Sequence, residues 1–175
     1  MGRIGKLLLL AGLVILLVVA IKVAQQAGSA QPTVTPPAIA SGAEQPCTPG
    51  DQDPYIYAPE RLQVLRPCLH ISGMVDSVDQ EDDGDVHLRL YLDSPYQSLL
   101  ADGNKYEEGD LVIEPVCYSL PLQADAMRLC ASNPDRIQAV PRVGDHVWME
   151  GRYVIDLQHW AWSELHPLYR WGKID

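Results

Sequence analysis

Residues 143–174 read VGDHVWMEGRYVIDLQHWAWSELHPLYRWGKI, and this stretch decides the fold. It holds all four tryptophans and three of the five histidines of the 175-residue chain. We expect one strand from His146 to Asp156 and a last strand from Trp162 to Lys173. Leu157–Ala161 is then a tight turn between them, and Gly151 permits a bulge in the first of the two strands.

Three further strands are expected earlier in the chain, at Leu69–Val78, Val86–Leu92 and Leu111–Cys117. The second has the clearest alternation of apolar and polar residues. Its core face is expected to carry Val86, Leu88, Leu90 and Leu92, and its other face Asp85, His87, Arg89 and Tyr91. A short helix is expected at Gln123–Cys130, and one helical turn at Tyr96–Leu100.

Five strands, a helix between the third and fourth, and Gly-Asp before the fourth resemble the OB-fold, a small Greek-key barrel. The run VGDHVWMEGRY is similar to the G-D-x-V-x-V-x-G-x-Y run of such barrels. The resemblance covers about Arg61 to Asp175 and implies an all-β class, a five-stranded OB-like barrel with a minor helix. The segments DGDVH and DLQHWAWSELHP also resemble uncharacterised exported or membrane-anchored prokaryotic proteins.

The first 24 residues predict a transmembrane signal-anchor helix. Leu7–Ile21 is free of polar side chains, and Arg3 and Lys6 before it form a flank that stays cytoplasmic. About 18 apolar residues just span a hydrocarbon core of ~30 Å. The alternative is a signal peptide cleaved near Gly28-Ser29-Ala30, which would give a secreted protein. Both interpretations place the remainder outside the cytoplasm.

Residues 25–60 predict a proline-rich linker, because half of the fourteen prolines fall there and such a composition cannot bury a core. The four cysteines all follow the apolar segment, and export favours disulfides between them. Of the three possible pairings we favour Cys117–Cys130, which closes a loop, and Cys47–Cys68, which joins the linker to the first strand. Free thiols or a zinc site are the alternatives.

The exported part is strongly acidic. All 23 acidic residues lie from Glu44 onward, against 10 of the 13 basic ones, which gives a formal charge of −13. Such a surface repels phosphate backbones, so no nucleic-acid partner is expected. It suits cation binding or a basic partner.

Four ligand-type side chains lie within eleven positions of the C-terminal stretch: Asp156, His159, Glu164 and His166. Glu164 and His166 are two apart on a strand and therefore share a face. Imidazole and carboxylate together are a ligand set for zinc or another divalent ion, whose open positions would activate a water. If the second and last strands lie close together, Asp85 and His87 join this set.

Structural interpretations compete with a metal site. A histidine beside a carboxylate is often an oriented hydrogen-bond pair that clamps two strands. The acidic residues of 79–85 are typical of a solvated hairpin. The segment DGDVHLRL also resembles the metal-binding strand of staphylococcal-type nucleases, with Asp83, Asp85 and Arg89 as the matching positions.

These observations support three hypotheses of different classes. The first is an extracytoplasmic OB-like binding or structural module, with an unknown protein or glycan partner and no catalytic activity. The second is a metal-dependent, nuclease-like hydrolase that uses the histidines and carboxylates above. The third is an oligosaccharide-binding domain, in which Trp160 and Trp162 stack on sugar rings.

Overall fold

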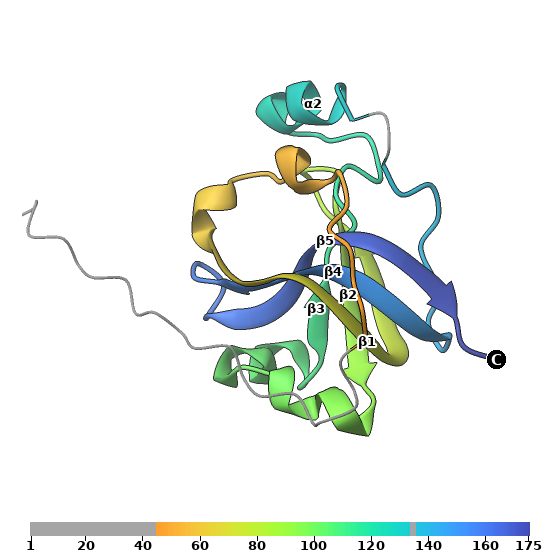
Figure 1. Ribbon diagram of the computed structural model, residues 1–175. Coiled ribbons are helices and arrows are strands. Elements are labelled where there is room, and N and C mark those ends of the chain that lie inside the picture. The colour runs from red at the N-terminus through yellow and green to blue at the C-terminus, as the bar shows by residue number, and fades with distance from the viewer. Residues whose placement is uncertain (1–44, 134–135) are drawn as a thin grey trace, which may run out of the picture. The chain divides into compact units, whose positions relative to one another are not determined.

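The computed structural model describes residues 45–133 and 136–175, and within them strands dominate (Figure 1). The strands are β1 (Leu62–Gln80), β2 (Val86–Leu92), β3 (Leu111–Ile113), β4 (His146–Asp156) and β5 (Trp162–Lys173). The helical elements are the short 3₁₀ turns η1 (Asp53–Tyr55), η2 (Pro59–Arg61), η3 (Ser94–Leu99) and η4 (Asp102–Glu107), and the α-helix α2 (Ala124–Cys130). The predicted all-β class is confirmed.

The strand pairings run β1-β2-β3-β5-β4 and return to β1, which closes the sheet. Four of the five pairings are antiparallel, and the pairing of β3 with β5 is parallel. In Figure 1, α2 and the η3–η4 segment lie at opposite ends of the sheet. The parallel pairing places β3 beside the beginning of β5, with Val112 opposite Glu164 and Ile113 opposite Leu165.

The interior is filled by the alternate residues of the strands. On β2 the expected core face is confirmed, because Val86, Leu88, Leu90 and Leu92 are all buried. His87 and Arg89 on the other face are half-buried, and Tyr91 is exposed. Asp85 was expected on that outer face but is buried, because it precedes β2 and its carboxylate turns inward to accept a hydrogen bond from the Cys117 N–H at 2.7 Å.

The bounds predicted for the second, fourth and last strands agree with β2, β4 and β5. The first strand is longer than predicted, because it pairs with β4 over Leu62–Met74 and with β2 over Gly73–Gln80. Its early half was missed because Pro67 interrupts the alternation, at a register shift between Arg66 and Leu69. The third strand is shorter than predicted and ends at Ile113.

The register of the β4–β5 pair shifts on both sides of Gly151, where a bulge was expected. A Cβ added to Gly151 would lie 2.7 Å from the carbonyl oxygen of Pro167, so the two strands approach closely here. Only glycine permits that approach without a backbone movement. One of these register shifts falls between Leu165 and Leu168 of β5, the stretch that contains His166.

Both expected disulfides are present, Cys47–Cys68 and Cys117–Cys130. The first joins the N-terminal segment to β1, and the second joins the chain after β3 to the end of α2. No free cysteine remains among the described residues. Two disulfides indicate an oxidising, extracytoplasmic environment.

The end of the predicted linker is packed on the sheet. Ile56 and Gln52 are buried, and the Tyr57 hydroxyl donates a hydrogen bond to Asp125 at 2.9 Å. The predicted signal-anchor helix and the first part of the linker lie outside the described residues. Within the residues that the structure describes, no helix combines the length and apolar character needed to cross a bilayer.

Candidate functional site

A pocket of about 540 Å³ opens between two turns of the chain, one joining β1 to β2 and one joining β4 to β5. Side chains of β2 and of the residue after β3 lie between these turns. The lining residues with ionisable side chains are Tyr57, Arg61, Asp79, Glu81, Asp83, His87, Glu107, Glu114 and His159. The indole of Trp162 completes the wall beside His159.

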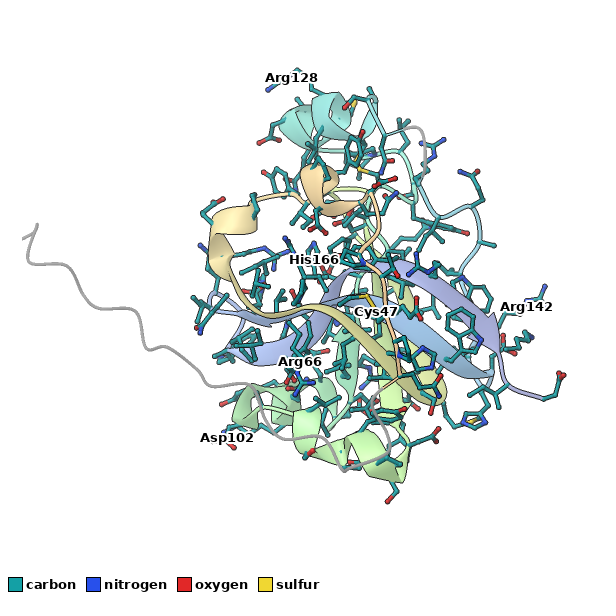
Figure 2. All side chains as sticks on the ribbon, in the orientation of Figure 1. Cys47, Arg66, Asp102, Arg128, Arg142 and His166 are labelled. Carbon is teal, nitrogen blue, oxygen red and sulfur yellow. A yellow bond between two sulfur atoms is a disulfide. The ribbon has the colours of Figure 1, made fainter. Side chains whose placement is uncertain are left out.

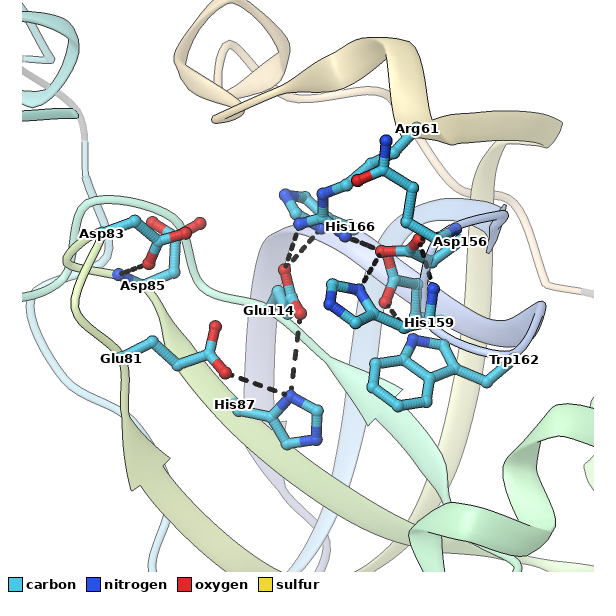
Figure 3. A network of polar contacts seen from close by, with 12 residues as sticks. Arg61, Glu81, Asp83, Asp85, His87, Glu114, Asp156, His159, Trp162 and His166 are labelled. Carbon is cyan, nitrogen blue, oxygen red and sulfur yellow. Dashed lines mark hydrogen bonds and ion pairs between the residues drawn. The ribbon is translucent and has the colours of Figure 1, made fainter. Parts of the chain in front are cut away.

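Glu114 is the centre of the polar network at the floor of this pocket. It follows β3 directly, and only 3% of its surface is exposed. Its Oε2 lies 2.5 Å from Nδ1 of His166 and 3.6 Å from Nη2 of Arg61. Its Oε1 lies 3.8 Å from Nδ1 of His87. Figure 3 shows Glu114 between the two histidines, so one carboxylate connects the pocket with the protein interior.

His166 is fully buried and lies near the middle of the molecule (Figure 2). Its Nδ1 also lies 3.1 Å from Oε1 of Glu164, which confirms that these two residues share a face of β5. The Trp162 indole N–H donates a hydrogen bond to the other oxygen of Glu164 at 2.7 Å. Trp162, Glu164 and His166 therefore form a buried chain along one strand.

Asp156 closes the turn between β4 and β5. Its Oδ1 accepts hydrogen bonds from the backbone N–H groups of Gln158 and His159, at 2.8 and 3.1 Å. Its Oδ2 lies 2.8 Å from Nδ1 of His159 and is ion-paired with Arg61. The His159 ring stacks on Trp162 with a centroid distance of 5.0 Å. Asp156 and His159 thus form the oriented pair that the structural interpretation expected.

His87 is the histidine that faces the pocket. Its Nε2 lies 3.0 Å from Oε2 of Glu107. Its Nδ1 lies 3.7 Å from Oε1 of Glu81, and the ring meets Trp162 edge-on at 5.6 Å. Three carboxylates, those of Glu81, Glu107 and Glu114, therefore surround this imidazole.

The carboxylates around His166 and His87 change the protonation of both imidazoles. Burial by itself would lower the pKa of His166, but the charge and hydrogen bonds of Glu114 and Glu164 raise it to about 10. Burial would likewise lower the pKa of His87, but Glu114 and Glu107 raise it to about 9. In the absence of a bound metal ion, both imidazoles are therefore protonated on both nitrogens and positively charged at pH 7.

Asp85 lies on the other side of Glu114 from the turn of Asp156 (Figure 3). Burial, and then the charge of Asp83, raise the pKa of the Asp85 carboxyl well above its usual value. One of its oxygens accepts from the Cys117 N–H, and Oδ2 has no hydrogen-bond partner among the described residues. Nε2 of His166 is also buried and without a partner there.

The structure brings the predicted site residues together only in part. Asp85 and His166 belong to one group with Glu114, in which the ligand atoms lie within 4.8 Å of one another, and His87 belongs to a second group with Glu81 and Glu114. In the described part of the chain, neither of these groups contains Asp156, His159 or Glu164, which bind protein groups instead. Strands β2 and β5 are not paired with each other, and Glu114, which directly follows the intervening strand β3, contacts His87 of β2 and His166 of β5.

Sequence reasoning did not select Glu114, Glu81 or Glu107 as site residues. The only sign of Glu114 was an acidic residue inside the apolar run LVIEPV. A carboxylate at such a position has to find a partner in the interior. That partner is His166, which is 52 positions away and is located only by the fold.

The predicted aromatic pair is divided. Trp160 is 64% exposed and contacts Tyr106 at a centroid distance of 5.1 Å, whereas Trp162 is only 6% exposed. Trp160 is thus the member of the pair with a face open for stacking. Besides carboxylates and imidazoles, the described lining of the pocket offers the Tyr57 hydroxyl, the Arg61 guanidinium and the amides of Gln80, Gln123 and Gln158.

Comparison of the chain with protein-family models, curated proteins and solved structures finds no match. The function of the site therefore has to be argued from its own residues. Those residues offer negative charge, two imidazoles and aromatic walls within one pocket.

Proposed function

We propose that this chain is an extracytoplasmic binding module of OB-like architecture, and that its pocket receives a positively charged ligand. In this proposal the N-terminal apolar segment holds the module at the membrane, or is cleaved to release it. The order β1-β2-β3-β5-β4 supports an OB-like barrel, because a short third strand parallel to the fifth closes it.

The position of the pocket supports a binding role. In OB-folds, ligands lie over the second and third strands and between the loops that join strands one and two and strands four and five. Here the pocket is lined from the corresponding two turns by Glu81 and Asp83 on one side and by Gln158 and His159 on the other. His87 of β2 and Glu114 after β3 form its floor.

The charge of the lining is the observation that carries the proposal. Five acidic residues line the pocket: Asp79, Glu81, Asp83, Glu107 and Glu114. The one guanidinium in the lining, that of Arg61, is ion-paired with Asp156. The indole of Trp162 and the phenol ring of Tyr57 add aromatic faces, which attract organic cations. A ligand that bears amino or guanidino groups fits this set, and a phosphate-bearing ligand does not.

Calorimetric titration of the full chain in detergent tests this proposal. Spermidine and a lysine-rich peptide are expected to bind, and an acidic peptide of the same length is not. Glu107→Gln removes one lining charge and is expected to weaken binding by about 5- to 10-fold, by the Coulomb energy of a partly exposed pair. Asp102→Asn removes an exposed charge in the same 3₁₀ turn but outside the lining, and is expected to leave binding unchanged.

Binding of the acidic peptide instead, or an equal loss in the two variants, would contradict a specific cation pocket. In the second case the attraction would come from the net charge of −10 rather than from the site.

A metal-dependent hydrolase is the second candidate, and one observation favours it. The ligand atoms of Glu81, His87 and Glu114 lie within 4.8 Å of one another at the floor of the pocket, where a substrate has access. A divalent ion held there with an open position would activate a water. This candidate predicts metal-dependent hydrolysis of phosphodiester or glycoside substrates that is lost in His87→Ala, and absence of turnover with Zn²⁺, Mn²⁺ and Mg²⁺ would exclude it.

A further inference from the structure

We propose that Asp85, Glu114 and His166 form a buried binding site for one divalent metal ion, with zinc as the ion that fits best. This site lies beneath the pocket and does not depend on the ligand proposed for it. It also differs from the set formed by Glu81, His87 and Glu114, since only Glu114 belongs to both.

The spacing of the three side chains fits a metal. Their ligand atoms lie within 4.8 Å of one another. Ligands at 2.0–2.2 Å from a tetrahedral zinc ion are separated by about 3.4 Å. Rotations that draw the atoms together by roughly an ångström would therefore complete the coordination.

Two potential ligand atoms of this site make no hydrogen bond in the described part of the protein. Nε2 of His166 and Oδ2 of Asp85 are buried and have no hydrogen-bond partner there. Both residues are almost fully enclosed, at 0% and 1% exposure. Buried polar atoms are rarely left unpaired, and a bound ion is one of the regular explanations when they are. A metal bound by both atoms would satisfy them together.

The opposite atom of each of these ligands is already held in place. Nδ1 of His166 contacts the carboxylate of Glu164, which the indole N–H of Trp162 holds in turn. Metal-binding histidines commonly have such a carboxylate on the nitrogen that does not bind the metal. Oδ1 of Asp85 accepts the Cys117 N–H, which leaves Oδ2 as its free oxygen. The site is thus oriented before an ion enters.

The donor set selects among ions. Two carboxylates balance the charge of a divalent cation, and one imidazole favours zinc over calcium or magnesium, which prefer oxygen ligands alone. Thiolate ligands are excluded, because all four cysteines form disulfides. Glu114 lines the pocket, which gives an ion a route to the site and leaves room for water as a fourth ligand.

Metal binding by the full chain tests the proposal. Chelator-treated protein is titrated with Zn²⁺ in the presence of a competing indicator, and with Co²⁺ for its visible spectrum. One equivalent of each metal is expected, with a higher melting temperature and a tetrahedral cobalt spectrum without a thiolate charge-transfer band. Less than one equivalent, or an octahedral spectrum, would overturn the proposal without variants being needed.

The variant Asp85→Asn tests whether the metal binds at the buried residues. It keeps the oxygen that accepts the Cys117 N–H but loses the charge, and zinc affinity is expected to fall by at least about 100-fold. Glu81→Gln is the matched control, because it disrupts only the outer set and is expected to leave zinc affinity within about 3-fold. The reverse result, loss in Glu81→Gln and not in Asp85→Asn, would place the metal in the pocket and refute the buried site. The binding of spermidine is measured on the same samples, so failure of this proposal and failure of the cation pocket can be distinguished.

Discussion

Oε2 of Glu114, the residue directly after β3, lies 2.5 Å from Nδ1 of His166 on β5, and both residues are buried. The parallel pairing of β3 with β5 makes this contact possible, since Glu114 N–H donates to the Leu165 carbonyl and Leu168 N–H donates to the Glu114 carbonyl. The carboxylate is thereby placed beside the imidazole, and the properties of the site depend on this pair.

The variant Glu114→Gln should destabilise the protein strongly. It leaves the protonated His166 and the neighbouring Arg61 without a full counter-charge in the interior, and breaking a buried ion pair costs about 3–5 kcal/mol. Urea denaturation monitored by tryptophan fluorescence measures the loss. Glu108→Gln is the control, because Glu108 is exposed and pairs with Arg89 at the surface, where such pairs contribute about 0–1 kcal/mol. Equal effects of the two substitutions would argue against a central role for Glu114.

The stability of chelator-treated protein should decrease as the pH rises above neutrality. The pKa of His166 is raised to about 10 and that of His87 to about 9, from about 6.5 in the unfolded chain. Folding therefore favours their protonated forms, and this contribution is fully present below pH 6.5 and is lost progressively as the pH approaches 9–10.

The midpoint of urea denaturation between pH 6 and pH 10 measures this effect. His87→Gln should reduce the slope above pH 7 without abolishing it, because His166 remains. A midpoint that rises steadily over this range would show that the histidines are neutral in the folded protein.

The variant Gly103→Ala should disturb the turn that carries His159. A Cβ at this position would lie 2.4 Å from the Trp160 carbonyl oxygen and 2.5 Å from the Trp162 nitrogen, both of which are backbone atoms. Because a backbone has to move to accept the methyl group, we expect a loss of about 2–3 kcal/mol and an altered tryptophan emission. Gly109→Ala is the control for this variant. No atom lies within 4 Å of a Cβ added to Gly109, so only the positive φ of this residue is unfavourable for alanine. We expect about 1 kcal/mol for it.

Removal of the Cys117–Cys130 disulfide should affect both stability and the buried site. Its loop has a sequence separation of 13, for which cross-linking contributes about 3 kcal/mol. The backbone N–H of Cys117 also holds Asp85, so the double variant Cys117→Ala/Cys130→Ala should weaken zinc binding by about 10-fold.

The corresponding double variant Cys47→Ala/Cys68→Ala is the control for that result. Its disulfide joins β1 to the N-terminal segment, and neither cysteine lines the pocket. We expect lower stability with unchanged zinc affinity. Equal losses of affinity in both double variants would indicate a general loosening of the domain rather than an effect through Asp85.

Local patterns in the sequence were sufficient for most of the strands. The alternation from Val86 to Leu92 and the bounds of β4 and β5 agree with the structure, and so do both disulfides. Where prediction failed, the cause was not local. Pro67 hid the first half of β1, whose strand character comes from pairing with β4. Strand β3 ends at Ile113, and its three residues pair with β2, while Val112 and Ile113 also pair with β5.

The candidate site was predictable only in its parts. Glu164 and His166 share a face because successive residues of a strand point to opposite sides, and this follows from the chain itself. Asp85 was expected on the outer face of the second strand but lies in the interior, because the Cys117 N–H, 32 positions away, provides a buried partner for its carboxylate. Glu114 went unrecognised for the same reason, since its partners Arg61 and His166 come from distant parts of the chain.

By itself, the sequence determined most of the strand pattern, because that depends on periodicity, and it favoured the observed pairing of the cysteines among the three possible ones without deciding it. It also determined the acidic character of the exported part, which is a matter of composition. Only the tertiary structure decided that Asp85, Glu114 and His166 meet, and that Asp156 and His159 close a turn instead. The physical reason is that charges separated along the chain interact only where the closure of the sheet brings them within a few ångströms and excludes water.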